Sequence, residues 1–197
     1  AGAGKSTVAK KLATKLGYIY VDTGALYRTV GLYSIRKGID TKDTEAVTAT
    51  LKDIKVELGF VDGAQHVFLN GEDVSDAIRT PDASMGASNV SAIPAVRTFL
   101  FDLQRDIAKN NNCIMDGRDI GTVVLPKANV KIFLTASAEV RAQRRLDELL
   151  AKGEKSITFQ SILADIKERD HRDMTRPVAP LKQAEDAVLL DTSDLTI

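Results

Sequence analysis

Apolar side chains recur every three or four residues in several stretches of this sequence, which is the spacing of a helix with one buried face. Val8, Leu12 and Leu16 follow this spacing near the start of the chain, and Gly17 is expected to end that helix. The same spacing predicts further helices over the approximate ranges 25–37, 40–51, 94–110, 138–151 and 158–174. The positions expected to face inward in the first of these are Ala25, Leu26, Val30 and Ile35.

Short apolar runs between these helices are typical of the buried strands of a parallel sheet. They cover residues 18–21, 113–115, 130–135 and 188–190. Because strands alternate with helices along the chain, we predict an α/β protein with a doubly wound parallel sheet.

The segment 54–74 departs from this alternation. Apolar residues occupy positions 56, 58 and 60, and two turn signals follow, Asp62-Gly63 and Asn70-Gly71. Alternation interrupted by such turns predicts a small antiparallel β insert. The segment 83–92 is small and polar, and we assign no element to it.

The first residues carry the second half of a phosphate-binding loop of the form G-x-x-x-x-G-K-[ST]. We expect the first glycine of that pattern, and a fifth strand that delivers the loop, to lie before Ala1, so that the sequence is a fragment. Small residues let successive backbone N–H groups surround phosphate oxygens. The nucleotide-binding residues expected here are Ala1, Gly2, Ala3, Gly4, Lys5, Ser6 and Thr7.

Two side chains of this loop have specific expected roles. Lys5 places a positive charge at the β- and γ-phosphates, and the Ser6 hydroxyl can ligate Mg²⁺. The alternative is a glycine-rich cap on an ordinary amphipathic helix.

Composition narrows the class of protein. The chain has 27 Lys and Arg against 27 Asp and Glu, so it lacks the broad basic field of a non-specific nucleic-acid binder. One cysteine, Cys113, cannot form an intrachain disulfide, and we interpret it as a buried strand residue. No apolar run is long enough for a membrane helix, and no signal peptide is evident. We therefore expect a cytoplasmic monomer that binds neither nucleic acid nor membrane.

Other segments bear on which phosphate chemistry is carried out. No N-K-x-D guanine-recognition motif occurs, which argues against a GTPase. Arginines are frequent near polar breaks, from Arg28 to Arg176. Transfer of a phosphoryl group between two phosphates needs many cations, because donor, acceptor and transferring group are all anionic. The arginine content therefore favours a kinase whose acceptor is itself a phosphate.

Several distinctive motifs are spread along the chain: DTGALYR at 22–28, DGRDIGTVV at 116–124, ERD at 168–170 continuing to Arg176, APL at 179–181, and the stretch from Asp186 to Ser193. These motifs resemble those of the bacterial type of cytidylate kinase. They occur in the family's order over nearly the whole chain, although Leu26 and Leu125 depart from its commonest residues. The resemblance implies the reaction ATP + CMP or dCMP → ADP + CDP or dCDP, with Mg²⁺.

Asp116 ends a predicted strand beside the phosphate loop, so its carboxylate can hold Mg²⁺ through water, together with Ser6; the alternative is a helix or turn cap. The resemblance also implies roles for other residues. The residues expected to bind the acceptor are Thr23, Arg28, Ser88, Arg97, Arg118, Asp119, Arg169, Asp173 and Arg176, with Ser88, Arg97 and Asp119 contacting the cytosine or its nucleoside. Arg141, Arg144 and Arg145 would bind ATP. Lys5, Arg118, Arg144 and Arg176 would act on the transferring group.

On a helix, Arg169, Arg172, Asp173 and Arg176 would share one side. We expect His66 and His171 to be surface residues without a catalytic or metal partner. The domain organisation we predict is a core over 1–53, a monophosphate-binding β insert over 54–83 and a continued core over 84–197. A lid is expected at about 141–176. Without bound phosphate, the arginines of this lid should repel one another, so the lid should be mobile. The turn at Asp62-Gly63 should be mobile too.

Two other functions stay open from the sequence. One is another small-acceptor kinase of the UMP, AMP or shikimate type, against which the β insert and the 116–124 motif argue. The other is a protein that binds nucleotide without turnover, against which Lys5, Ser6 and Asp116 argue.

Overall fold

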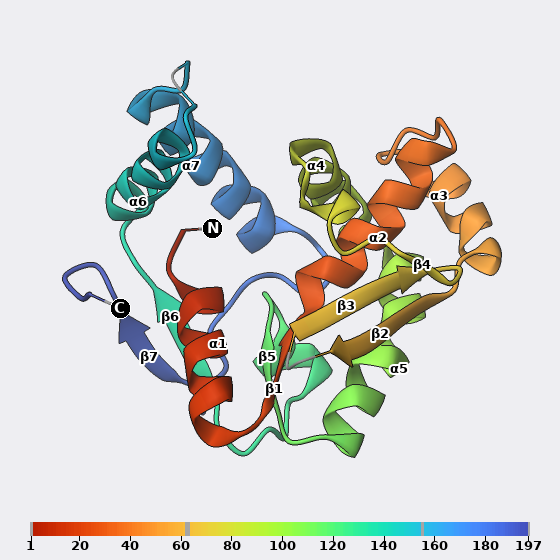
Figure 1. Ribbon diagram of the computed structural model, residues 1–197, viewed down its shortest axis with the longest axis horizontal. Coiled ribbons are helices and arrows are strands. Elements are labelled where there is room, and N and C mark those ends of the chain that lie inside the picture. Colours follow the sequence, from red (N-terminus) through yellow and green to blue (C-terminus); the bar gives the residue numbers. More distant parts are fainter. Residues whose placement is uncertain (1, 62–63, 155, 197) are drawn as a thin grey trace. The chain divides into compact units, whose positions relative to one another are not determined.

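The computed structural model describes residues 2–61, 64–154 and 156–196. Its helices are α1 Lys5–Leu16, α2 Thr23–Arg36, α3 Thr44–Thr50, α4 Pro81–Val90, α5 Pro94–Asn110, α6 Ala138–Ala151 and α7 Phe159–Thr175 (Figure 1). Its strands are β1 Ile19–Asp22, β2 Val56–Val61, β3 Ala64–Leu69, β4 Glu72–Asp73, β5 Cys113–Asp116, β6 Ile132–Thr135 and β7 Val188–Asp191. Shorter helical turns are η1 Leu51–Asp53, η2 Ala77–Arg79 and the π-type η3 Ile120–Val124.

The chain divides into two compact units. One comprises residues 9–117, and the other comprises residues 1–8 and 118–197. We call them the 9–117 unit and the 118–197 unit. Each contains one pair of parallel strands, β1 with β5 in the first and β6 with β7 in the second. The predicted α/β class with parallel strands and a small antiparallel sheet is confirmed.

The core of the 9–117 unit is built around α2. Leu26 and Val30 of α2 and Leu100 of α5 are fully buried. Gly31 and Gly86 bring α2 and α4 into direct backbone contact, since a Cβ on Gly31 would lie 2.9 Å from the Gly86 carbonyl carbon. The absence of side chains at this crossing is therefore what allows the two helices to approach so closely.

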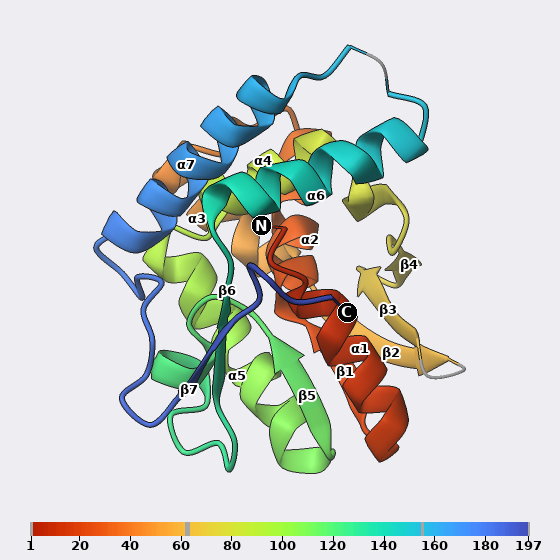
Figure 2. The ribbon, with the colours of Figure 1, turned by 90° about the vertical axis from the view of Figure 1, so that its left-hand side faces the viewer.

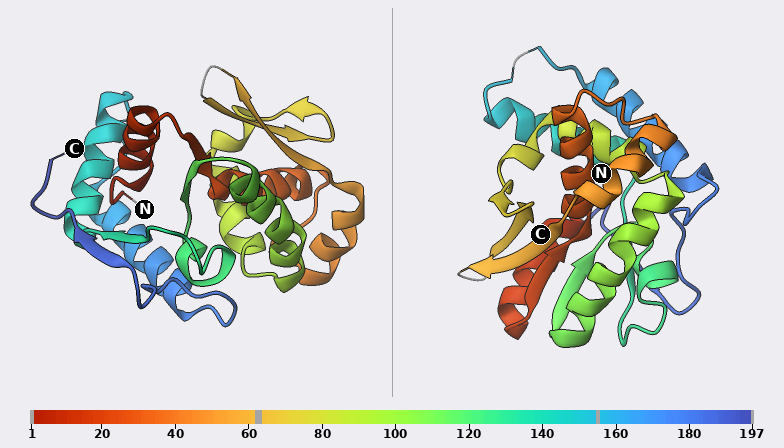
Figure 3. Two further views of the ribbon diagram at one scale, coloured as in Figure 1. Left: turned by 90° about the horizontal axis from the view of Figure 1, so that it is seen from below. Right: turned by 90° about the vertical axis from the view of Figure 1, so that its right-hand side faces the viewer.

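The antiparallel insert is a three-stranded sheet with the order β2-β3-β4 (Figure 3, left). Val56 pairs with Leu69 in its register, and both side chains are buried. They belong to the same apolar cluster as Leu26 and Val30 of α2. The insert thus has no separate core, because its apolar face packs on the helices of its own unit.

The hairpin of the insert holds an unusually acidic carboxyl group. The Ser75 hydroxyl and backbone N–H donate hydrogen bonds to Asp73 Oδ1, at 2.5 and 2.9 Å, and His66 Nδ1 lies 2.7 Å from Oδ2. The Ser75 hydroxyl, the Ser75 N–H and His66, in that order of importance, lower the pKa of Asp73 to about 2. His66 is therefore a partly exposed residue, as predicted, but it has an acidic partner.

These contacts predict how the contribution of Asp73 to stability depends on pH. Because the pKa of Asp73 is lower in the folded chain, its stabilising effect should be complete above the unfolded value of about 4 and disappear as the pH falls towards about 2. Ser75→Ala should raise the pKa of Asp73 towards its ordinary value. Carboxyl NMR of both chains measures the two midpoints. An unchanged midpoint in Ser75→Ala would contradict the assigned cause.

The 118–197 unit contains a helical pair, α6 and α7, drawn in cyan and blue and joined by a loop in Figure 2. Ala142, Ile162 and Ile166 form its buried contact. An ion pair 2.6 Å long, between Arg141 and Asp170, adds a charged link between the two helices. The pair is thus held by apolar packing and by opposite charges together.

Several burial predictions are wrong. Leu16 of α1 is 51% exposed and Ile35 of α2 is 39% exposed, although both were expected to face inward. Val188 and Leu189 of β7 are 65% and 56% exposed, so β7 is not a buried strand. Leu16 and Ile35 lie in the last turns of their helices. In the described ranges, β7 has β6 as its only strand partner, so it forms the edge of a two-stranded sheet. The fifth strand expected before Ala1 lies outside the sequence.

The helix α4 was not predicted. It begins where the Thr80 hydroxyl accepts a hydrogen bond from the Ala83 N–H, with Pro81 in the first turn. Both are ordinary helix-start signals. Within the described ranges, none of the helices has both the length and the apolar character needed to traverse a lipid bilayer.

Candidate active site

The phosphate loop has the backbone shape that its glycines allow. Gly2 and Gly4 have φ angles of 77° and 83°, in the left-handed region that favours glycine. α1 follows at once, with the Val8 N–H donating to the Gly4 carbonyl at 3.0 Å. Lys5 and Ser6 therefore stand in the first turn of a helix, the position from which such residues reach phosphate and its metal. Ala1 lies outside the described residues.

Gly2 is also required by a close approach within the 118–197 unit. A Cβ on Gly2 would lie 2.9 Å from the Arg141 carbonyl oxygen of α6. Any larger residue would push the loop away from α6.

Thr192, directly after β7, joins the phosphate loop to the strand ends. Its hydroxyl lies 3.2 Å from the Ala3 carbonyl oxygen and 3.0 Å from the Thr135 carbonyl oxygen. Arg144 donates to the Thr192 carbonyl at 2.6 Å and to the Leu195 carbonyl at 3.0 Å. Thr192 lies in the stretch from Asp186 to Ser193 that resembles the family, but no role was predicted for it.

The three arginines predicted to bind ATP have different surroundings. Arg141 is buried and holds the Ala136 carbonyl and Asp170. Arg144 bonds to the segment after β7, whereas Arg145 is exposed and pairs with Glu148 at 2.8 Å. The structure brings Arg144 next to a residue that contacts the phosphate loop, and it brings Arg145 to solvent.

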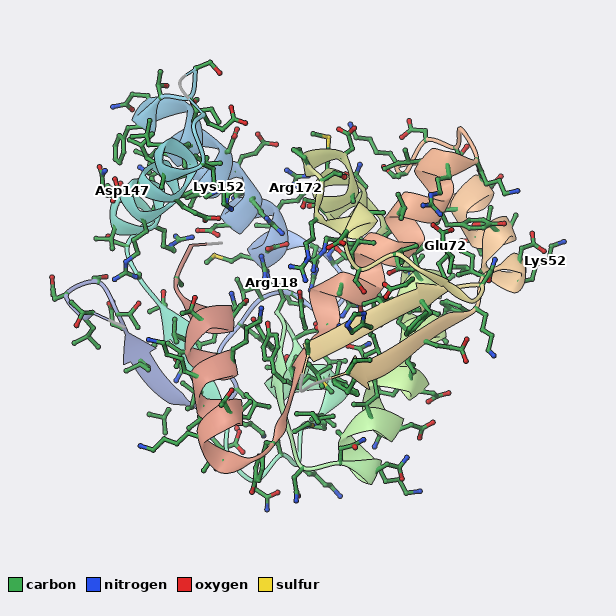
Figure 4. The ribbon with its side chains drawn as sticks, in the orientation of Figure 1. Lys52, Glu72, Arg118, Asp147, Lys152 and Arg172 are labelled. Carbon is green, nitrogen blue, oxygen red and sulfur yellow. The ribbon has the colours of Figure 1, made fainter. Side chains whose placement is uncertain are left out.

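Four predicted acceptor residues meet at the C-terminal end of α7. Arg118 Nε donates to Asp173 at 2.9 Å, and Arg118 is labelled in Figure 4. Arg176 lies 3.9 Å from Asp119, and both side chains are almost fully buried. Arg176 Nε also donates to the carbonyl of Ala179, a residue with a φ of 48°. Arg118 and Asp119 thus form one charged cluster with Asp173 and Arg176, although the two pairs of residues are distant in sequence.

Arg169 and Arg172 lie on the same helix with different environments. Arg169 stands one turn before Asp173. Arg172, also labelled in Figure 4, is exposed and pairs with Glu168 at 3.2 Å. Arg169, Arg172 and Asp173 have on α7 the helical spacing that was predicted to put them on one side, and of these Arg172 is exposed whereas Asp173 is buried. Carboxylates pair with several arginines of 141–176, and these ion pairs oppose the repulsion predicted among them.

In the 9–117 unit, β1 and β5 end at a second group of predicted residues. The Thr23 hydroxyl donates to the Asp116 carbonyl at 2.9 Å, and the Tyr20 hydroxyl donates to the Asp116 carboxylate at 3.3 Å. Arg28 pairs with Asp22 at 2.6 Å. Arg28 Nε is buried, and no hydrogen-bond partner for it lies among the described residues. Gly24 makes room for the Asp22–Arg28 pair, since a Cβ there would lie 3.1 Å from the carboxylate.

The two cytosine-recognition candidates of this unit lie on α4 and α5. Arg97 is buried, donates to the Ser91 carbonyl at 3.1 Å and stacks 5.5 Å above the Tyr27 ring. The Ser88 carbonyl accepts a hydrogen bond from the Ser91 hydroxyl at 3.0 Å. Ser88 and Arg97 therefore each contact Ser91. Tyr27 was not predicted as a site residue, although it lies in the DTGALYR motif at 22–28.

A cavity of about 100 Å³ lies beside Arg28. Its polar lining residues are Lys10, Tyr20, Asp22, Arg28, Gln65, Ser75 and Arg79. Gln65 was not predicted as a site residue, and no sequence signal marks it, because a polar residue at every second position of a strand is ordinary.

The oxygen donors predicted for Mg²⁺ are the Ser6 hydroxyl and the Asp116 carboxylate. They belong to different units, and no group of three acidic, cysteine or histidine residues suited to a metal occurs in the ranges the structure describes. Oxygen donors of this kind suit Mg²⁺, which usually takes one or two protein ligands and keeps several waters. Burial raises the pKa of the Cys113 thiol, in keeping with a strand residue that is not a nucleophile.

Comparison with known proteins gives a consistent result. The family model described as cytidylate kinase matches residues 1–197. A cytidylate kinase of Caldicellulosiruptor bescii is 51% identical over 197 residues, 100% of this chain and 87% of that protein. A cytidylate kinase of Bacteroides fragilis is 50% identical over 199 residues, covering 98% and 86%. A cytidylate kinase of Ligilactobacillus salivarius is 51% identical over 197 residues, covering 100% and 88%.

Proposed function

The chain belongs to the cytidylate kinase family, and on that premise we propose that it transfers the γ-phosphoryl group of ATP to CMP or dCMP. A phosphate oxygen of the acceptor forms a bond to the γ-phosphorus, and the bond from that phosphorus to the β–γ bridging oxygen breaks. The products are ADP and CDP or dCDP. The match of the family over residues 1–197 carries this proposal.

We propose that the ATP phosphates lie in the loop 1–7. The left-handed glycines and the first turn of α1 direct backbone N–H groups to the phosphate oxygens. Lys5 neutralises charge on the transferring group, as in other phosphate-loop kinases. Arg144, which is bonded beside this loop through Thr192, adds a second positive charge. Arg141 and Arg145 complete the proposed ATP-side set, although Arg141 also holds α6 to α7.

For the acceptor nucleotide we propose Thr23, Arg28, Arg118, Arg169, Asp173 and Arg176. The pairing of Arg118 with Asp173 supports this, because a carboxylate holds the guanidinium in one orientation before the anion arrives. The buried, unbonded Nε of Arg28 supports it too, since a buried donor is costly to leave without an acceptor. Catalysis in this reaction is mostly positioning and charge stabilisation.

Mg²⁺ would be held by Ser6 and Asp116, the hydroxyl and carboxylate suited to it. When bound, it would neutralise charge on the phosphates. We further propose that residues 54–83 form the acceptor-binding insert and that 141–176 form a lid. We also propose that the enzyme acts as a monomer in the cytoplasm.

A turnover panel tests the function. ATP is offered with CMP, dCMP, UMP, AMP and shikimate in turn, and ADP formation is followed. The proposal expects CMP and dCMP to be the best acceptors. A preference for UMP, AMP or shikimate would assign another small-acceptor kinase, and nucleotide binding without any turnover would assign a binding protein.

The cytosine contacts give a more specific prediction. Arg97→Ala and Asp119→Asn should each raise the KM for CMP about tenfold and leave the KM for ATP unchanged. When one of the polar groups that hydrogen-bond the base is removed, its partner on the base is left unpaired. The lost binding energy corresponds to about a tenfold rise in KM. Discrimination between CMP and UMP should relax as well. Steady-state kinetics with each nucleotide varied measures these constants, and an effect on ATP alone would reverse the donor and acceptor assignments.

A further inference from the structure

One side chain of the insert holds the backbone of β1 at two points. Gln65 Oε1 accepts a hydrogen bond from the Asp22 N–H at 2.7 Å, and Gln65 Nε2 donates to the Asp22 carbonyl at 3.3 Å. Gln65 lies on β3, 43 residues further along the chain. Both residues belong to the 9–117 unit.

Gln65 makes the two backbone hydrogen bonds that a neighbouring strand would otherwise make with Asp22. β1 pairs with β5 along one edge, where Asp22 faces Asp116. The N–H and C=O of one strand residue point to the same side, and groups on an edge are costly to bury without partners. The amide of Gln65 supplies one acceptor and one donor, which is what the free edge of Asp22 needs.

Asp22 is the last residue of β1 and directly precedes α2, the helix that carries Thr23 and Arg28. Its carboxylate pairs with Arg28 at 2.6 Å, and the next residue, Thr23, donates to the Asp116 carbonyl. Both Asp22 and Arg28 line the cavity that Gln65 also lines. A shift of the Asp22 backbone would therefore move Thr23 and the partner of Arg28 together.

We propose that Gln65 is a positioning residue for CMP: it fixes the turn at Asp22 and thereby aims Thr23 and Arg28 at the acceptor. This rests on the proposed function. Gln65 acts through Asp22 and need not touch the substrate. Leucine, of similar size, would fill the space without either hydrogen bond, and glutamate would keep the acceptor but lose the donor.

The test compares three variants with the parent chain. Gln65→Leu should raise the KM for CMP about tenfold, about 1.4 kcal/mol, and leave the KM for ATP unchanged. Gln65→Glu should give a smaller rise in the same constant. His66→Leu is the matched control, because it alters the adjacent residue of the same strand, which pairs with Asp73. It should change neither KM.

A readout independent of turnover accompanies the kinetics. Amide hydrogen exchange at Asp22 should become about tenfold faster in Gln65→Leu, because the N–H loses its acceptor, and should stay unchanged in His66→Leu. A purely structural role for Gln65 would lower the melting temperature and kcat while leaving both KM values unchanged, and that result would overturn the proposal. So would a KM for CMP within twofold of the parent value in both Gln65 variants.

The two proposals fail in different ways. If the parent chain phosphorylates no nucleoside monophosphate, the proposed function fails, and with it the role of Gln65 in binding CMP. Normal turnover of the parent chain with an unaltered acceptor KM in the Gln65 variants would overturn the positioning role alone.

Discussion

Replacing Lys5 with alanine is expected to lower kcat for CMP phosphorylation about a thousandfold while the chain still unfolds cooperatively. The change removes a positive charge from the transferring phosphoryl group, where preorganised charges of this kind contribute factors of about 10² to 10⁵. Lys5 is only half-buried at the start of α1 and contributes nothing to either apolar core cluster. Single-turnover kinetics and thermal unfolding of the same sample measure the two effects.

Lys11→Ala is the matched control, since it removes the same charge from an exposed position of the same helix. It should retain full turnover. If Lys5→Ala lost cooperative unfolding, or if both variants lost activity equally, Lys5 would be a structural or merely electrostatic lysine and not a catalytic one.

Gly31→Ala is expected to destabilise the chain by about 2 kcal/mol. In most helices the same exchange is stabilising by about 0.5 to 1 kcal/mol, so the sign itself is informative. Here the added methyl carbon would lie 2.9 Å from the backbone of α4, which has no flexible side chain to move aside. Urea unfolding gives the change in free energy. A midpoint that stays or rises would mean that α2 and α4 can separate at little cost.

Helices with strong periodicity and clear ends were predictable. α5 and α6 begin and end at the predicted residues, because Pro94 and Ser137 start them and their apolar faces are regular. α4 was missed because its serine, glycine and asparagine residues have weak helix propensity. Its contact with Gly31 of α2 stabilises it, and no single-sequence pattern reveals such a contact.

The contacts of the candidate site were also predictable in part. The strands that end at Asp22 and Asp116 were predictable from their apolar runs, and their parallel pairing brings Thr23 to Asp116. The partners of the arginines could not be predicted, because Asp173 and Asp170 are separated from Arg118 and Arg141 by many residues. The number of arginines in 141–176 suggested that they repel one another. In the structure, several of these arginines form ion pairs with carboxylates.

The hydrogen bond between Thr192 and Ala3 has a consequence for the order in which the chain is made. It joins residues 189 positions apart, so the phosphate loop, among the first of these residues to be synthesised, acquires this support among the last. Contacts of such long range form slowly, after local helices have assembled. A nascent chain would therefore have a glycine-rich loop without its supporting threonine until β7 had left the ribosome, and nucleotide capture should follow the emergence of β7.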